Sequence, residues 1–246
     1  PFLVAAGLAL VNALYGYFVL PESLDLEHRR SFDIKRANPV SSLLKLKKYP
    51  AVLGLIFSLL LIYLAAHSVQ SNWSFANINK FGWTPKMIGI SLAVVGVLVS
   101  LVQGLLIRVV NPKLGNEKSV YIGIAMYAIG LTLFAFATQG WMMFLFLVPY
   151  CLGGISGPAL QALISSHVPK NEQGELQGSL TGLNSLTTIF GPSMMIGLTS
   201  YFSIKNDPNH IYFPGAAFLF GAVLMGLSAI IAYWVLKHDS TALKQS

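Results

Sequence analysis

Seven long apolar segments dominate this sequence and constrain its fold more than any other feature. They comprise residues 1–20, 51–70, 87–109, 119–138, 141–165, 176–202 and 212–236. Each is long enough for a helix to cross about 30 Å of hydrocarbon. No Asp, Glu or Lys lies near the middle of any segment. The segments are continuous apolar runs rather than alternating patterns, so transmembrane helices are predicted and a membrane β-barrel is not.

The composition excludes a water-soluble fold. Hydrophobic residues make up 54% of the 246 residues and charged residues only 10%, whereas a soluble domain carries about 25% charged residues. One soluble core of this length cannot hide so much apolar surface, so we predict an all-α integral membrane protein. A soluble enzyme, a disordered regulator and a collagen-like fibre are excluded. The sequence has no Walker, zinc-ligand or dinucleotide-binding motif, so neither an ATP-driven pump nor a metal site is predicted.

The basic residues are distributed unevenly between the two sides of the predicted membrane. When the seven segments cross in alternating directions, one side holds 13 basic residues and the other holds Lys80, Lys86 and Lys205. Basic residues collect in cytoplasmic loops, which explains the net charge of +7 without a nucleic-acid partner. The asymmetry predicts that the first segment runs inward and that the C-terminal tail, residues 237–246, is cytoplasmic.

Residues 21–50 are predicted to form a basic cytoplasmic loop. Leucines alternate with lysines between Pro39 and Pro50, a pattern that favours a short amphipathic helix in the headgroup layer. A solvated basic linker is the alternative. The chain begins with Pro1 and shows no basic n-region or cleavage site, so we expect a truncated fragment rather than a signal peptide.

Two of the predicted helices contain a glycine–proline pair. Gly157-Pro158 lies in the 141–165 segment and Gly191-Pro192 in the 176–202 segment. Proline removes a helical donor and glycine lets a neighbour pack into the resulting bend. The pairs favour two bent helices beside a cavity; ordinary kinking of membrane helices is the alternative.

Three stretches of the sequence together resemble one transporter family. They are residues 20–24 (Leu-Pro-Glu-Ser-Leu), Trp73 with residues 81–83 and 88–92, and residues 153–178 with Pro158-Ala159-Leu160-Gln161 and Gln173-Gly174-Glu175-Leu176-Gln177-Gly178. Over essentially its whole length the chain resembles the major facilitator superfamily, specifically the tetracycline-resistance type of drug:proton antiporter. The resemblance implies seven transmembrane helices of a twelve-helix fold. Residues 1–20 then match helix 6, residues 21–50 the central loop, and residues 51–236 the six-helix C-terminal bundle, helices 7–12.

The resemblance also assigns conformational motifs. Gly191-Pro192 resembles the C-half counterpart of the antiporter motif of this family. Gly104, Arg108 and Gly115 fit a degenerate copy of its gating motif, whose acidic member is missing here.

Two positions depart from the tetracycline exporters. Several of these exporters carry a histidine in helix 8 and an aspartate in helix 9, where this chain has Val99 and Tyr127. Without a membrane-embedded carboxylate in this half, the resemblance implies that acidic residues of the N-terminal half couple proton movement.

Polar and aromatic side chains within the predicted helices are the candidate substrate contacts, because polar groups in hydrocarbon need a cavity or a partner. The candidates are His67, Gln70, Trp73, Gln103, Tyr150, Gln161 and Asn184. For each amide, an interhelical hydrogen bond is the alternative. Trp83 and Trp141 lie at helix ends and are expected to be interfacial anchors.

One motif would suggest an enzyme. Residues 154–157, Gly-Ile-Ser-Gly, match the G-x-S-G pattern of rhomboid-type intramembrane proteases. That chemistry needs a histidine in a later helix to activate the serine. His167, His210 and His238 all lie outside the predicted spans, so Ser156 is interpreted as a small packing residue and no enzymatic activity is predicted.

The resemblance implies proton-coupled efflux of tetracycline-like drugs by alternating access. No cofactor is expected beyond the proton gradient and a divalent cation carried by the drug. The expected partners are the bilayer of a bacterial inner membrane, the drug and the N-terminal half, without which this fragment is predicted to be inactive. A carrier for another small molecule and a non-transporting scaffold or sensor are the alternatives.

Overall fold

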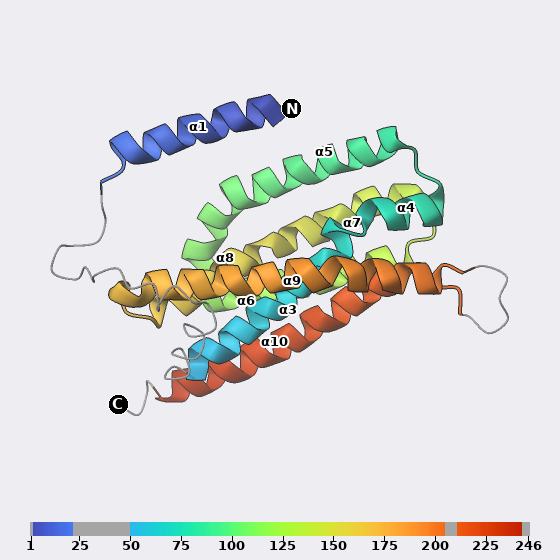
Figure 1. Ribbon diagram of the computed structural model, residues 1–246. Helices are drawn as coiled ribbons and strands as arrows, with labels where there is room; N and C mark the ends of the chain where they lie inside the picture. Colours follow the sequence, from blue (N-terminus) through green and yellow to red (C-terminus); the bar gives the residue numbers. More distant parts are fainter. Residues whose placement is uncertain (1, 22–49, 205–210, 243–246) are drawn as a thin grey trace.

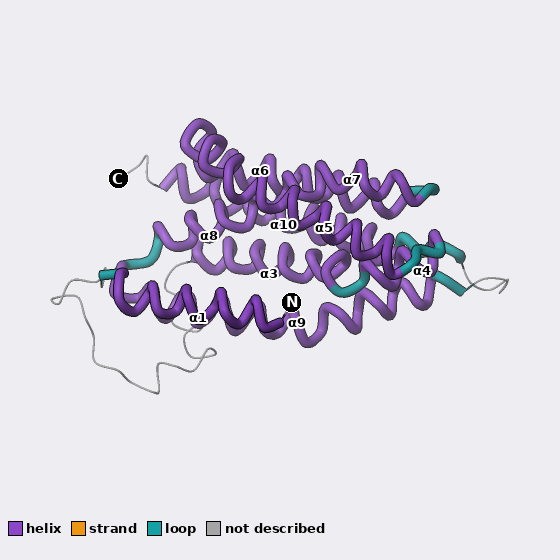
Figure 2. The backbone as a smooth tube through the Cα atoms, turned by 90° about the horizontal axis from the view of Figure 1, so that it is seen from above, coloured by secondary structure: helices purple, strands orange, loops and turns teal. Residues whose placement is uncertain are grey.

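The computed structural model describes residues 2–21, 50–204 and 211–242, with side chains described as far as residue 238, and this part of the chain is helical without any strand. The α-helices are α1 (Phe2–Val19), α3 (Pro50–Gln70), α4 (Trp73–Phe81), α5 (Pro85–Leu101), α6 (Ile107–Phe136), α7 (Gly140–Leu152), α8 (Ser156–Ser166), α9 (Gln173–Phe202) and α10 (Ala216–Ala242). The long helices run roughly along one common direction (Figures 1 and 2). The amphipathic helix expected at residues 39–50 lies outside the described residues, except for Pro50, the first residue of α3.

Helices occupy all seven predicted spans. Four stretches of the described chain are long and apolar enough to cross a membrane: Pro50–Gln70, Pro85–Phe136, Gly140–Ser166 and Ala216–His238. The second has 52 residues and contains the predicted span 87–109 and residues 119–136 of the next one. Helix α1 is shorter, and α9, which is rich in Ser, Thr and Gly, does not belong to this set.

The short helix α4 was not predicted as a separate element. The predicted span 51–70 ends where α3 ends, at Gln70, and a tight turn then starts α4 at Trp73. Gly82 closes α4 in a left-handed conformation, with φ of 65°, which glycine adopts without steric cost. Helix α5 then begins at Pro85, and the Thr84 side chain accepts a hydrogen bond from the Met87 amide as its N-cap.

The run from α5 to α6 is interrupted twice. Residues Val102–Leu106 form a π-helical turn, which accommodates one more residue per turn than an α-helix. Within α6, Gly115 has φ of 78° and ψ of 164°, so the helical backbone is interrupted there. Glycine adopts this positive φ without steric cost because it has no Cβ. The 52-residue stretch therefore consists of separate helical pieces, as the two predicted spans require.

The predicted span 141–165 is also irregular. A 3₁₀ turn at Gly153–Ile155 separates α7 from α8, just before Gly157-Pro158. Helix α9, in contrast, is continuous from Gln173 to Phe202 through Pro192.

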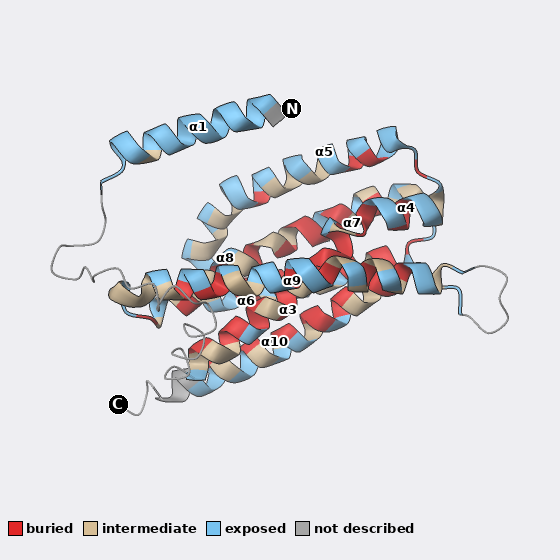
Figure 3. Ribbon diagram, in the orientation of Figure 1, coloured by how far each residue is buried: buried red, intermediate tan, exposed pale blue. Residues whose placement is uncertain are grey.

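The core centres on α10, which packs against both α3 and α6, while α7 and α8 pack on α6 and α9 packs on α3. Figure 3 shows the buried residues gathered on the faces that these helices turn toward one another. Lipid tails are as apolar as leucine, so membrane helices associate mainly by close packing between small residues. An added Cβ at Gly123 would lie 2.7 Å from the Ser156 nitrogen, and one at Gly130 would lie 2.7 Å from the Tyr150 Cα atom. These glycines let α6 approach α7 and α8 directly.

A buried pair of serines joins α3 to α10. The hydroxyl oxygens of Ser58 and Ser228 lie 2.7 Å apart, and the Ser228 hydroxyl donates to the Ser58 carbonyl at 2.9 Å. Both side chains are fully buried. Each serine thereby gives the polar atoms of the other a hydrogen-bond partner, which hydrocarbon could not supply.

Helix α1 contributes nothing to this core. From Leu3 to Val19 every residue is exposed except Gly16, which is half-buried, and in Figure 3 the α1 ribbon is coloured as exposed along almost its whole length. An apolar helix with no buried side chain needs lipid or another protein surface to cover it.

The expectation that Trp83 anchors at the interface is wrong. Its side chain is 8% exposed, stacks on Phe144 with ring centroids 5.4 Å apart, and meets Trp73 edge to face. The turn after α4 carries Trp83 back over Gly140, which leaves room for the indole. Trp141 is 60% exposed, as an anchor would be.

We predict that Gly130→Ala destabilises the bundle, because the new methyl group would collide with the Tyr150 backbone rather than with a movable side chain. Overpacking of this kind costs about 1–3 kcal/mol. Gly226→Ala on α10 is the matched control, since nothing lies within 4 Å of its added Cβ. The measurement is the apparent Tm of both purified variants in detergent. Equal Tm values would contradict the close α6–α7 approach.

Candidate functional site

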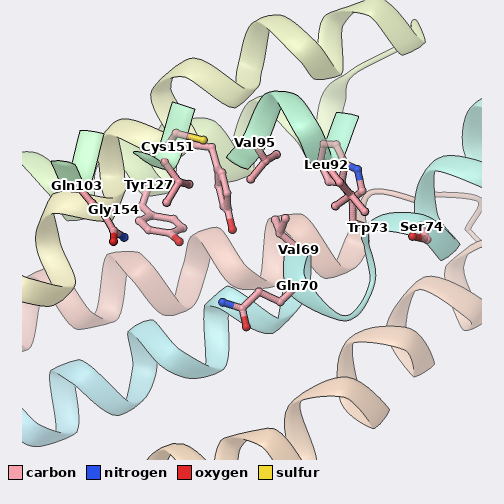
Figure 4. Close-up of a pocket in the computed structure, with 12 residues that line it drawn as sticks. Val69, Gln70, Trp73, Ser74, Leu92, Val95, Gln103, Tyr127, Cys151 and Gly154 are labelled. Carbon is pink, nitrogen blue, oxygen red and sulfur yellow. The ribbon is translucent and has the colours of Figure 1, made fainter. Parts of the chain in front are cut away.

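A cavity of about 430 Å³ opens between α3, α4, α5, α6 and α7. Figure 4 shows side chains from several helices pointing into it. Its lining residues are Val69, Gln70, Trp73, Ser74, Leu92, Val95, Val99, Gln103, Tyr127, Tyr150, Cys151 and Gly154. We call this space the main cavity.

A smaller hollow of about 220 Å³ continues the main cavity. Gln70, Gln103, Tyr127 and Gly154 line both spaces. The smaller hollow adds Ile62, Tyr63, Ala66, Ser156, Gly157, Pro158 and Gln161. The two spaces together form one continuous polar and aromatic surface.

The π-helical turn at Val102–Leu106 places Gln103 at this surface. Turns of this kind shift the direction of side chains within a helix and are frequent at functional sites. The turn faces the 3₁₀ turn at Gly153–Ile155, and the Gln103 amide nitrogen lies 3.9 Å from where Gly154 would carry a Cβ. Figure 4 shows the Gln103 amide beside Gly154. Two irregular helical segments therefore meet at one end of the main cavity.

Two tyrosines form an aromatic wall. The rings of Tyr127 and Tyr150 meet edge to face, with centroids 4.8 Å apart. Gly153 lies directly against the Tyr127 ring, and Gly130 lies against the Tyr150 backbone. Small residues thus let two large rings fit between α6 and α7, where they present apolar faces to the cavity.

Trp73 is held rigidly at the opposite end. Its indole nitrogen donates to the Ser91 hydroxyl at 2.9 Å, and its ring lies 5.2 Å from Phe134 in an edge-to-face contact. The side chain is buried and still lines the main cavity. Since its one polar atom is already paired, the ring offers a ligand stacking and apolar contact.

The structure brings together five of the seven predicted contact residues. Gln70, Trp73, Gln103 and Tyr150 line the main cavity, and Gln161 lines the smaller hollow, where its amide donates to the Tyr63 hydroxyl at 2.8 Å. Substrate contact by any of these residues stays a prediction.

His67 and Asn184 lie outside the lining of both spaces. His67 is buried with its ring directly against Gly191. Asn184 is exposed on α9, and its carbonyl accepts hydrogen bonds from Thr187 and Thr188. The spacing of His67, Gln70 and Trp73 suggested a shared face, but the turn between α3 and α4 separates Trp73 from that helix.

The predicted motif residues occupy different environments. Gly157 and Pro158 line the smaller hollow, and Gly191 packs against His67. Gly104 lies in the π-helical turn, Gly115 at the break in α6, and Arg108 is exposed between them. Half-buried Pro192 follows Gly191 within α9.

Sequence reasoning missed several lining residues. Tyr63 lies seven residues before Gln70 and therefore on the same helical face, a signal that could have found it. Val99 and Tyr127 were noted only as departures from the tetracycline exporters, yet both line the main cavity. Cys151 gave no signal beyond being the single cysteine.

The lining of both spaces, as described, holds no charged residue and no histidine. Its polar groups are carboxamides, hydroxyls and one thiol. Carboxamides both donate and accept hydrogen bonds. Such a surface selects a ligand by hydrogen bonding and ring stacking rather than by ion pairing.

We predict that Gln70→Cys is accessible to a water-soluble thiol reagent and that His67→Cys is not, in a Cys151→Ala background. Gln70 is exposed at the main cavity, whereas His67 is buried against α9. Reaction with a methanethiosulfonate reagent should be at least about tenfold faster at position 70, because thiol reactivity follows access. Equal rates would contradict the placement of His67 outside the cavity.

Comparison with known proteins places the chain in a family. The model for the Major Facilitator Superfamily matches residues 74–246. The class C tetracycline resistance protein of Escherichia coli is 38% identical over 198 residues, which cover 80% of this chain and 50% of that protein. The class E protein of Escherichia coli is 33% identical over 201 residues, covering 81% of this chain and 49% of that protein.

A human relative matches a larger share of this chain than the two Escherichia coli proteins do. The human protein named Hippocampus abundant transcript-like protein 1 is 26% identical over 257 residues, covering 98% of this chain and 51% of that protein. The chain thus spans about half the length of the curated relatives it matches. The family model covers well over half of the chain and confirms the predicted assignment to this superfamily. This chain is a multi-pass membrane protein of the Major Facilitator Superfamily.

Proposed function

We propose that this chain is the C-terminal half of a proton-coupled exporter of tetracycline-like drugs. The observation that carries the proposal is the main cavity, an uncharged, aromatic and hydrogen-bonding space within a membrane bundle. The relatives of this chain that are named tetracycline resistance proteins support this substrate class. We propose that the protein lies in a bacterial inner membrane, on its similarity to the Escherichia coli relatives. We propose that its C-terminus is cytoplasmic, on the distribution of basic residues.

The cavity chemistry suits a planar drug that carries many oxygen atoms. The carboxamides of Gln70 and Gln103 can form hydrogen bonds with both hydroxyl and carbonyl groups, since each carboxamide can donate and accept. The rings of Trp73, Tyr127 and Tyr150 supply faces on which a flat ring system stacks. A divalent cation would enter bound to the drug, because the described lining offers no carboxylate or imidazole to hold one.

The other wall of the cavity would come from the N-terminal half. Gln70, Ser74 and Gln103 line the main cavity and are also exposed, so the space is open on one side. Exposed polar groups of this kind need a protein partner within a bilayer. Helix α1, whose side chains are uncovered, would pack with that missing half. The chain alone is therefore expected not to transport.

Transport would follow alternating access, with two bundles rocking about a site at the middle of the membrane. Drug and proton would drive the cycle only by binding the two states with different affinity. Since Val99 and Tyr127 occupy the lining positions where several exporters carry titratable residues, the proton-binding carboxylates would belong to the N-terminal half.

The first test is tetracycline accumulation in cells that express the complete native reading frame, with and without a protonophore. We expect low accumulation that rises when the proton gradient collapses, since export against a gradient needs an energy source. Cells carrying the empty vector are the control. Accumulation equal to these cells in both conditions would contradict tetracycline as substrate and would favour another small molecule.

The second test is Gln103→Ala in the complete protein. Loss of one hydrogen bond to the drug should weaken binding by roughly two- to twelvefold, corresponding to about 0.5–1.5 kcal/mol. Gln139→Ala, in the exposed turn between α6 and α7, is the matched control and should bind normally. Equilibrium binding of tetracycline to purified protein is the measurement. Unchanged affinity at normal expression would assign Gln103 a structural role.

A further inference from the structure

A separate hollow of about 400 Å³ lies at the end of the bundle where α4 and α6 end and the chain leads into α10. It shares no residue with the main cavity or its smaller extension. Its lining residues are Lys80, Phe81, Ala135, Phe136, Ala137, Thr138, Tyr212, Phe213 and Pro214. We call it the end hollow. Neither the sequence motifs nor the proposed transport cycle uses it.

Lys80 supplies the one basic side chain in this described lining. Its ammonium nitrogen donates to the Ala135 carbonyl at 2.9 Å, in the last turn of α6, and lies 5.4 Å from the centre of the Phe81 ring. A cation at a helix C-terminus is favourable, because carbonyl groups there lack intrahelical donors. An ammonium has three donors, and the carbonyl accepts only one. No carboxylate pairs with Lys80 among the described residues.

The surroundings of this cation are apolar. Lys80 lies on α4, outside the predicted spans, and burial lowers the pKa of its ammonium from the ordinary 10.5 to about 8. Desolvation penalises the charged form of a lysine, and a nearby anion reverses that penalty. The side chain is nevertheless protonated at neutral pH. The end hollow therefore holds a partly desolvated positive charge that an anion would stabilise.

Aromatic side chains line the same hollow as Lys80 and reach the surface of the molecule. The rings of Phe136 and Phe213 lie 5.6 Å apart, and Phe136 is 60% exposed. Phe136 is also the last residue of the apolar stretch Pro85–Phe136. The end hollow thus lies at the end of a helical stretch that is long and apolar enough to cross a membrane, which is where lipid headgroups are expected.

We propose that the end hollow binds an anionic phospholipid, with the lipid phosphate on the Lys80 ammonium and an acyl chain along Phe136 and Phe213. Charge and position argue together for this occupant. The ammonium group favours a phosphate. The exposed aromatic side chains beside it favour a ligand that also carries an apolar chain, as a phospholipid does. The hydroxyls of Thr138 and Tyr212 line the same space and offer further donors.

The test is lipid retention by the protein purified from its complete reading frame, measured by native mass spectrometry in a neutral detergent. Phosphatidylglycerol and phosphatidylcholine with the same acyl chains are added in parallel. We expect preferential retention of phosphatidylglycerol, and a roughly tenfold weaker retention in Lys80→Gln, the effect of losing one charge-assisted hydrogen bond. Lys86→Gln is the matched control, since Lys86 is an exposed lysine on the predicted same side and should leave retention unchanged.

A third variant separates loss of charge from loss of structure. Lys80→Arg keeps the positive charge and should retain phosphatidylglycerol. The proposal is overturned if Lys80→Gln binds like the unmodified protein, if Lys86→Gln loses lipid equally, or if Lys80→Arg loses lipid while its Tm is normal. It is also overturned if inorganic phosphate at millimolar concentration displaces phosphatidylglycerol completely, because the end hollow would then bind free phosphate rather than a lipid.

Discussion

Close approach of helix backbones is the interaction on which the rest of this structure depends. Inside a bilayer the lipid tails compete equally well for apolar side chains, so burial alone does not hold helices together. Glycines at the contact points let the backbones come close, so that van der Waals packing holds the helices together. Gly130 and Gly153 admit Tyr150 and Tyr127 between α6 and α7, and the same contacts place both rings at the main cavity. Removing that space would disturb the site as well as the fold.

Two groups of polar side chains within the bundle contrast with each other. Some are paired internally: Ser58 with Ser228, and Trp73 with Ser91. Pairing of this kind satisfies groups that hydrocarbon would leave without partners, and it fixes the helices relative to each other. Gln103, in contrast, is exposed at the surface of the main cavity. The distinction between the two groups rests on geometry, because both contain ordinary uncharged residues.

Hydropathy predicted the helical segments because a helix that crosses a bilayer must be long and apolar, and both properties can be read directly from the sequence. The substrate candidates were found in part for a related reason: Gln70 and Gln103 are conspicuous in apolar surroundings. What the sequence could not specify depends on neighbours distant along the chain. Trp83 is buried because Phe144 and Gly140 come to it, and His67 faces Gly191 instead of the cavity. Neither contact leaves a trace in local composition.

The break at Gly115 has a mechanical consequence. A continuous helix transmits bending and rotation along its whole length, as a stiff rod does. Here Gly115, with its positive φ, interrupts the helix between the part of the chain that carries Val99 and Gln103 and the part that carries Tyr127. Both parts line the same cavity. A change in the direction of either part would therefore change the width of that cavity.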